Sequence, residues 1–407
     1  MSSFPESSQS EAQNHAFLLR TAELLHQYGT PSFRLEGVMG RMAQSLNIRG
    51  VFLYTPTALV VALGSGSAER TYLRRVDAGD VDISKVLAFD ATLEDLESGR
   101  ITVSEAADQL ETIANAPPAF PLSISLLAAA LACAGVAVII GGNAVDVMAA
   151  GCFGFVLAWI TTLSRRSGTP RGWLEPVLGF GTAITAVIIG RWLPIDDRLV
   201  TLAALILPIP GLAITIALTE LATGHLSSGS ARLAGALVTL FTLVVGVAIA
   251  WRFTANWTPP QQPAMAALPP WCLWVAIALT PAAFAVVFKA PLSQWPAILS
   301  VVVCGFLAGR ITGDFAGSEV GAFMGALVVG CGSNAYARIR NRPAMVPQTP
   351  GLLILVPGSI GYKSLTALVE SDTLHGVELA FSMAIIGVSL AGGLLLANQI
   401  ISPRRIL

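Results

Sequence analysis

The sequence predicts an α-helical polytopic membrane protein that carries a separate α+β domain at its N-terminus. Hydrophobic residues make up 54% of the 407 residues and charged residues only 12%, and the mean hydropathy is +0.69. These values lie far outside the range of ordinary soluble globular proteins. Charge is also unevenly spread, because residues 1–118 hold 24 of the 49 charged side chains. The boundary at Pro117-Pro118 therefore separates a polar domain from an apolar one.

Two helices are predicted at the start of this domain. The amphipathic spacing over residues 15–28 predicts a helix that Gly29 ends. Thr30 is expected to cap a second helix, with Pro31 at its first position, where the missing N–H costs nothing.

A short antiparallel sheet and two further helices follow. Three β-rich runs are separated by Pro56 and by a Gly-Ser-Gly turn, and they cover residues 51–54, 58–63 and 71–76. Helical spacing returns over residues 81–97. Thr102 and Glu105 then form a capping box, which opens the last helix of a compact α+β domain.

The charge of this domain limits its partners and location. It holds 15 acidic and 9 basic side chains, a net charge of −6, which argues against binding nucleic acid or anionic lipid. Residues 1–10 lack the basic and apolar regions of a signal peptide, so the domain is expected to stay in the cytoplasm. The cysteines and histidines show no spacing for zinc, haem or a disulfide frame, so we expect no metal and no cofactor.

Ten segments after Pro118 are long enough to span a bilayer, which requires about 20 apolar residues each. They cover residues 120–140, 145–163, 173–193, 199–219, 230–251, 271–289, 294–311, 318–337, 348–368 and 375–399. They divide into a five-helix unit over 119–255, a periplasmic linker over 256–270 and a second five-helix unit over 271–407. An even number of spans places both termini in the cytoplasm.

The distribution of basic residues supports this orientation, because cytoplasmic loops are richer in Lys and Arg. The inward ends carry Arg165, Arg166, Arg171, Arg232, Lys289, Arg338, Arg340, Arg342, Arg404 and Arg405. The outward ends carry only Arg191, Arg198, Arg252, Arg310 and Lys363.

An odd number of helices, repeated in tandem, must insert the second time with opposite orientation, so the two units are predicted to be inverted repeats. Pro-Gly interrupts the fourth segment of each unit, at Pro210-Gly211 and at Pro357-Gly358. Each of these glycines is followed by another glycine 18 residues later, Gly229 in the first unit. Matched breaks predict paired discontinuous helices that line a transport path, although Pro-Gly can also kink helices for packing alone.

Ionisable residues at membrane depth are costly and therefore candidate functional groups. Glu220 lies just after the first break and opens a polar stretch that contains Gly229 and Arg232. These residues are predicted to line a vestibule of the substrate path. The alternative is a plain cytoplasmic loop whose Arg follows the positive-inside rule.

Four carboxylates are candidates for carrying a coupling proton, since desolvation raises the pKa of a carboxyl group towards neutrality. They are Glu220, Asp314, Glu319 and Asp146. Simple solvation in loops is the alternative for each. If Glu220 couples protons, Glu220→Gln should abolish pH-dependent export and leave the protein inserted.

An enzyme reading rests on His26, Arg34 and Glu36, which lie close together in the first helix pair of the polar domain. No nucleophile elbow, metal-ligand motif or Gly-rich phosphate loop accompanies them. We therefore expect a protein that is not an enzyme and does not hydrolyse ATP.

Three motifs carry a resemblance to a known family. They are the run from His26 through Gly29-Thr30-Pro31 to Arg34 and Glu36, the stretch from Glu220 to Arg232, and Leu355-Val356-Pro357-Gly358 with Gly361-Tyr362. Together they resemble the bacterial threonine/serine exporter family over essentially the whole chain. That resemblance implies export of L-threonine and L-serine across the inner membrane by the proton motive force, with relatives split into two chains that are implicated in succinate export. It also implies functional roles for Glu220, where many members have Asp, and for Arg232.

The predicted mechanism is that broken-helix ends bind the carboxylate and ammonium groups of an amino acid while a nearby carboxylate exchanges protons. Pro210, Gly211, Pro357 and Gly358 are expected to line one cavity near the midplane. The expected partners are a small-molecule substrate, protons and the lipid bilayer. A dicarboxylate exporter, a passive channel and a membrane-anchored hydrolase remain alternatives. The polar domain could be a regulator, and Gly- and Ala-rich helix faces allow homo-oligomers.

Overall fold

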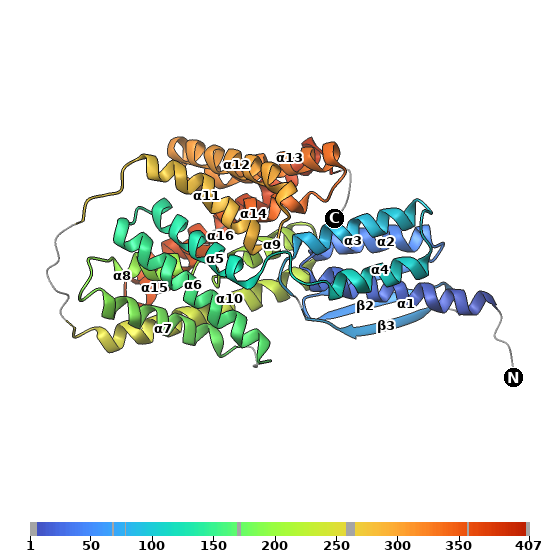
Figure 1. Ribbon diagram of the computed structural model, residues 1–407, viewed down its shortest axis with the longest axis horizontal. Coiled ribbons are helices and arrows are strands. Elements are labelled where there is room, and N and C mark those ends of the chain that lie inside the picture. The colour runs from blue at the N-terminus through green and yellow to red at the C-terminus, as the bar shows by residue number, and fades with distance from the viewer. Residues whose placement is uncertain are drawn as a thin grey trace.

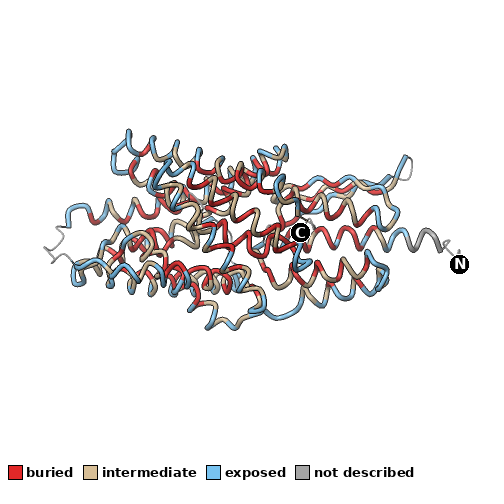
Figure 2. Tube along the Cα trace, turned by 90° about the horizontal axis from the view of Figure 1, so that it is seen from above, coloured by how far each residue is buried: buried red, intermediate tan, exposed pale blue. Residues whose placement is uncertain are grey.

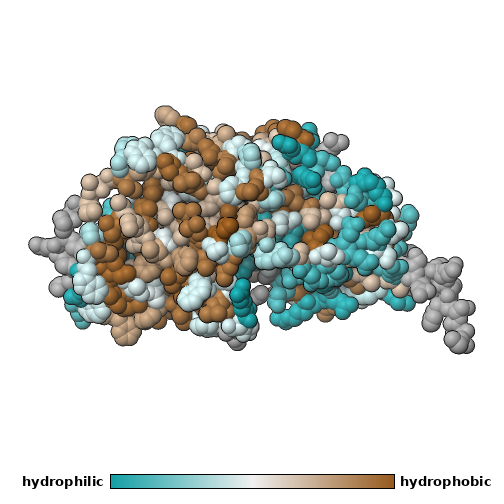
Figure 3. All heavy atoms as spheres, viewed as in Figure 1, coloured by the Kyte–Doolittle hydropathy of each residue, from teal (hydrophilic) through white to brown (hydrophobic). Residues whose placement is uncertain are grey.

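The computed structural model describes residues 6–66, 69–77, 79–168, 172–257, 265–355 and 358–403. It is elongated, with an N-terminal unit at one end and a bundle of long helices at the other (Figure 1). The surface of the bundle is largely apolar, whereas the surface of the N-terminal unit is largely polar (Figure 3). This division follows the uneven charge of the sequence.

The N-terminal unit consists of four helices and a three-stranded sheet. The elements are α1 (Glu6–Gln27), α2 (Ser32–Ser45), β1 (Gly50–Thr55), β2 (Ala58–Leu63), β3 (Arg70–Arg75), α3 (Ile83–Glu97) and α4 (Val103–Asn115). The sheet is antiparallel in the order β1-β2-β3, with Val51 opposite Ala62 and Val60 opposite Leu73. Its alternating inner face packs on the helices, so that Tyr54, Leu59 and Leu63 are fully buried.

The predicted elements of this unit are confirmed, including the capping box of α4, in which Thr102 and Glu105 each bond the other's backbone N–H. One detail was wrong. Thr30 does not cap α2: Pro31 occupies the cap position, and the buried Thr30 hydroxyl has no partner. The group that replaces it comes from the helix bundle and is described below.

The helix bundle follows the order of the ten predicted segments. The first half contains α5 (Leu122–Ile139), α6 (Ala144–Arg166), α7 (Leu174–Ile189), α8 (Asp197–Ala204), α9 (Gly211–Ala222) and α10 (Leu226–Thr254). The second contains α11 (Trp271–Val287), the short 3-10 helix η2 (Leu292–Gln294), α12 (Trp295–Ala316), α13 (Ser318–Arg340), α14 (Met345–Leu355), α15 (Gly358–Val369) and α16 (Thr373–Ile400). Each fourth segment is therefore two short helices rather than one.

Seven helical stretches of the described residues are long and apolar enough to cross a membrane. Three shorter apolar helices, α7, α9 and α11, lie where the other predicted spans fall. Buried residues run along the centre of the bundle, while many residues on its outside are exposed (Figure 2). The chain is therefore a multi-pass membrane protein, and the exact number of ten spans stays a prediction.

The two halves share one residue spacing. Helices α9 and α15 are each 12 residues long, and their first residues, 211 and 358, are 147 apart. A Cβ atom placed on Gly246 would lie 2.0 Å from the carbonyl oxygen of Pro176, and one placed on Gly393 would lie 2.4 Å from that of Phe323. Both members of the second contact again follow the first by 147 residues (246 to 393, 176 to 323). Equivalent helix pairs are thus packed backbone to backbone through equivalent glycines.

This packing predicts a stability difference between two glycines of one helix. Gly246→Val should destabilise the purified protein, by about 1–3 kcal/mol for overpacking of a tight contact. Gly235→Val in the same helix α10 is the control, because a Cβ atom there has nothing within 4 Å. Thermal unfolding in detergent measures both, and equal melting temperatures would contradict the close contact of α7 with α10.

The N-terminal unit is joined to the bundle by polar contacts outside its own core. The Lys289 ammonium lies 3.0 Å from the Asp82 carboxylate, and the backbone N–H of Ile83 donates to the carbonyl of Phe288. Arg165 at the end of α6 pairs with Asp80. These contacts identify the ends of α6 and α11 that face the N-terminal unit.

Candidate functional site

The two helix breaks meet inside the bundle. A Cβ atom placed on Gly358 would lie 3.1 Å from the Cα of Gly211 and 2.7 Å from a methyl carbon of Ile209, so only glycine fits there. Pro210 is the cap residue of α9, whereas Pro357 lies outside the described residues. From this crossing α9 runs towards the N-terminal unit and α15 runs away from it (Figure 1). The predicted meeting of the breaks is therefore found for Gly211 and Gly358.

Glu220 lies near the end of α9 and is fully buried. Arg232 of α10 donates two hydrogen bonds to its carboxylate, each 3.1 Å long, and the Ser228 hydroxyl donates a third at 2.8 Å. Gly229 permits this arrangement, because a Cβ atom there would lie 2.9 Å from the carbonyl oxygen of Ala217. The close approach of α10 to α9 brings Arg232 to Glu220, in place of the solvated loop considered as the alternative.

The Glu220 carboxylate also caps a helix of the N-terminal unit. The backbone N–H of Ser32, the first residue of α2, donates to it at 2.9 Å, and the Ser32 and Ser228 hydroxyl oxygens lie 2.6 Å apart. A carboxylate is a favourable group at a helix N-terminus, where N–H groups are unsatisfied and the dipole is positive. Glu220 thus takes the capping role that the sequence analysis gave to Thr30.

The rest of the same motif contacts both halves of the bundle. The Glu36 carboxylate lies 3.2 Å from Nε2 of His225, whose Nδ1 lies 3.1 Å from the Thr223 hydroxyl. Arg34, which is buried, donates to the side-chain amide oxygen of Gln348 in α14. Burial raises the pKa of Glu36 and lowers that of Arg34 to about 10, so Arg34 remains charged at neutral pH.

A small cavity lies between this motif and the broken helices. Its volume is about 40 Å³, close to the space of one water molecule, so it cannot hold an amino acid as it stands. The motif forms one side and the broken helices the other, with the lining residues Gly29, Pro31, Phe33, Arg34, Leu212, Ile216, Thr219, Gln348, Thr349 and Leu352 among them. The N-terminal unit therefore fills the end of the bundle where α9 terminates.

The remaining predicted proton carriers lie elsewhere. Asp146 is 2% exposed, and its carboxylate accepts from the backbone N–H groups of Asn143 and Asp196. It caps α6 and ties the α7–α8 connection to it, so it is not a solvated loop residue. Asp314 is exposed and Glu319 half-buried at the α12–α13 turn. None of the three contacts Glu220.

Of the motif in the N-terminal unit, Gly29 lies in the left-handed backbone region and lines the small cavity. His26 is 2% exposed, and its Nε2 lies 3.2 Å from the carbonyl oxygen of Pro56, inside the unit. Arg34 and Glu36 meet the bundle, whereas His26 does not hydrogen-bond to it. Among the described residues there is no cluster of three or more His, Cys, Asp or Glu side chains that could hold a metal ion.

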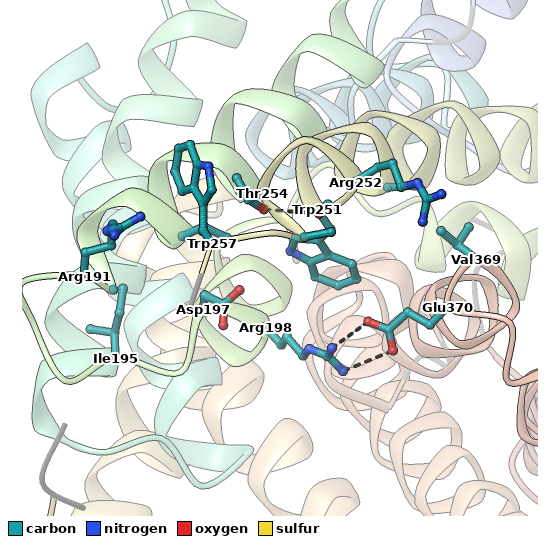
Figure 4. Close-up of a pocket in the computed structure, with 14 residues that line it drawn as sticks. Arg191, Ile195, Asp197, Arg198, Trp251, Arg252, Thr254, Trp257, Val369 and Glu370 are labelled. Carbon is teal, nitrogen blue, oxygen red and sulfur yellow. Dashed lines mark hydrogen bonds and ion pairs between the residues drawn. The ribbon is translucent and has the colours of Figure 1, made fainter. Parts of the chain in front are cut away.

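The opposite end of the bundle holds a large open cavity. Its volume is about 730 Å³, and it is lined by the ends of α7, α10 and α15 and the start of α8 (Figure 4). Arg198 and Glu370 form a bidentate pair there, with distances of 2.8 and 3.1 Å. The sequence analysis gave Glu370 no role, because no local signal shows that residue 370 faces residue 198.

Sequence comparisons identify the family. The family model of the threonine/serine exporters, ThrE, matches residues 16–254, and a second model, threonine/serine exporter ThrE_2, matches residues 273–400. The chain belongs to the threonine/serine exporter family. The family resemblance drawn from the three motifs is thus confirmed, and the family is one of membrane exporters.

Individual relatives of this exporter are distant in sequence. A protein named probable threonine/serine exporter from Mycobacterium tuberculosis is 24% identical over 95% of this chain and 76% of its own length. Pheromone-regulated membrane protein 10 of Eremothecium gossypii is 25% identical over 88% of this chain. The chain spans about half the length of that fungal relative. No solved structure matches the exporter.

The buried His26 predicts that the N-terminal unit of the exporter loses stability in acid. Burial lowers its pKa below the ordinary 6.5, so the folded state binds fewer protons than the unfolded state. The stabilising contribution is complete above about pH 6.5 and is lost as the pH falls towards the lower folded pKa. We expect the fall in melting temperature between about pH 7.5 and about pH 5.5 to be smaller in His26→Gln. His375→Gln, at an exposed position, is the control, and an unchanged fall in His26→Gln would contradict the assignment.

Proposed function

We propose that this chain is a secondary active exporter of L-threonine or L-serine in the bacterial inner membrane, driven by the proton motive force. The observation that carries the proposal is the crossing of two broken helices at Gly211 and Gly358, with the buried Glu220 on the helix that leads away from it. Broken helices leave unpaired backbone donors and acceptors where a zwitterion can bind. Glu220 is the proposed proton carrier, with Arg232 as its partner in the unprotonated state.

The proposed topology is ten spans arranged as two inverted repeats, 119–255 and 271–407, joined by a periplasmic linker over 256–270. The common spacing of 147 residues supports a repeat (211 to 358, 246 to 393). The opposite directions of α9 and α15 from the crossing support inversion (Figure 1). The pseudo-two-fold axis would then pass near Gly211 and Gly358, as in other transporters built from inverted repeats.

The proposed role of residues 1–118 is a cytoplasmic domain that closes the inner entrance. Its support is the set of contacts that α2 makes with Glu220, His225 and Gln348. With these contacts made, the inner cavity is too small for substrate while the far cavity is large. The conformation is accordingly proposed to be outward-open, and loading from the cytoplasm requires α2 to leave Glu220.

Uptake into inside-out vesicles tests the proposed function. Labelled threonine, serine and succinate are offered separately, with and without a protonophore. Protonophore-sensitive accumulation of threonine or serine is the expected result. Accumulation of succinate alone would replace the substrate with a dicarboxylate, and flux that ignores the protonophore and follows the gradient would indicate a channel. Vesicles that lack the protein are the blank for each substrate.

A further inference from the structure

The large outer cavity carries more charge than a solvent-filled mouth of a bundle requires. Three arginines and two carboxylates line it, Arg191, Arg198, Arg252, Asp197 and Glu370. Arg198 is bound to Glu370, and its guanidinium lies 5.4 Å from the ring centre of Trp251. In Figure 4, Arg198 reaches towards Glu370, while Asp197 lies on the other side of it, below Trp257. Positive and negative groups therefore lie around one space.

Within the described residues, Arg191 and Arg252 have no carboxylate partner within ion-pair distance. Arg191 instead lies over the ring of Trp257, at 5.4 Å from the ring centre. Such a guanidinium keeps its hydrogen-bond donors available while the aromatic face holds its position. Arg252 lines the same cavity at the end of α10. Both arginines can accept a carboxylate from a ligand.

Two buried polar groups of the cavity wall also lack partners in the described structure. The Tyr362 side chain is 3% exposed, and its hydroxyl has no hydrogen-bond partner. Its electrostatic interactions with Asp197, Arg198 and Glu370 place the hydroxyl beside the charged groups. The indole N–H of Trp251 is likewise without an acceptor. Unsatisfied buried donors are rare and costly, so they point to a ligand that completes the wall.

We propose that this cavity is an outer binding site for a zwitterionic α-amino acid, distinct from the crossing of Gly211 and Gly358. The α-carboxylate binds the arginines at 191 and 252, and the α-ammonium binds Asp197. This inference rests on the proposed function and adds a release site to it. The exposed Arg198–Glu370 pair is worth little by itself, so either member can exchange its partner for a ligand group at small cost.

The charges of the lining favour a zwitterion over a dicarboxylate. Glu370 occupies one arginine, and Asp197 remains to attract an ammonium group and to repel a second carboxylate. A cavity of about 730 Å³ is within the usual size of small-molecule sites, with room for an amino acid and several waters. A dicarboxylate would need two cationic positions and no Asp197.

Equilibrium binding of labelled L-serine to the purified full-length protein in nanodiscs tests this site. Asp197→Asn and Arg252→Gln are each expected to weaken binding by about tenfold, as the loss of one charge-assisted hydrogen bond predicts. Arg310→Gln is the matched control, because Arg310 is an exposed arginine of the second half that does not line the cavity. The melting temperature of each variant shows whether it is folded.

The results separate this site from the proposed function. Succinate should compete poorly with serine in the wild type and better in Asp197→Asn. Wild-type serine affinity in both folded variants would overturn the outer site, as would stronger competition by succinate than by serine in the wild type. Vesicle uptake by the wild type is measured in parallel, so that export with unaltered binding in the variants rejects the outer site alone. An absence of both uptake and binding in the wild type would reject both proposals.

Discussion

Export by the Glu220→Gln variant is expected to fall by at least about tenfold at every pH, each factor of ten being about 1.4 kcal/mol of barrier. Glutamine has nearly the same shape and can still accept the N–H of Ser32, but it can neither carry a proton nor neutralise Arg232. The Arg232 side chain is only 16% exposed, so its charge would be left poorly solvated. Protonophore-sensitive uptake into inside-out vesicles, measured over a pH series, gives the result.

Two further variants separate transport from stability in this experiment. Removing both charges in Glu220→Gln/Arg232→Gln should recover much of the lost stability, because no unpaired charge remains, but it should not recover export. Glu220→Asp keeps the charge and shortens the side chain by one methylene, so it should keep part of the activity. Wild-type export by Glu220→Gln across the pH series would remove Glu220 from proton coupling.

Local sequence patterns predicted the parts of the fold that depend on neighbouring residues. The capping box of Thr102 and Glu105 is made by residues three apart, and the interruption before Gly211 follows from the prolines beside it. The sheet likewise follows from alternating residues and a Gly-Ser-Gly turn. These features need no knowledge of the tertiary structure.

Contacts between distant residues could not be predicted in this way. Ser32 and Glu220 are 188 residues apart, and the pair forms only because the N-terminal unit docks on the bundle. Thr30 was a reasonable cap by local rules, yet a carboxylate from another part of the chain took the position. Asp146 and Glu370 were read as loop residues for the same reason, although Asp146 ties two loops together and Glu370 pairs across the two halves.

A disulfide between residues 32 and 228 is expected to stop export reversibly. The Ser32 and Ser228 hydroxyl oxygens are 2.6 Å apart and both side chains are buried, so Ser32→Cys/Ser228→Cys places two sulfurs within the reach of a disulfide of about 2.05 Å. The bond would hold α2 on Glu220 and keep the inner entrance closed. Uptake into inside-out vesicles should fall to background after oxidation and return after reduction.

The single variants Ser32→Cys and Ser228→Cys distinguish this lock from damage by the substitutions or by oxidation of the native cysteines. Each should export equally well before and after oxidant, because neither can form the new bond. If the oxidised double variant is fully cross-linked and still exports at the wild-type rate, α2 does not have to leave Glu220 and the inner entrance lies elsewhere. If only the double variant stops, and reductant restores it, movement of the N-terminal unit is a required step of export. The contact between Ser32 and Glu220 would then couple that movement to the group proposed to carry the proton, because α2 can leave more easily once protonation has removed the negative charge that caps it.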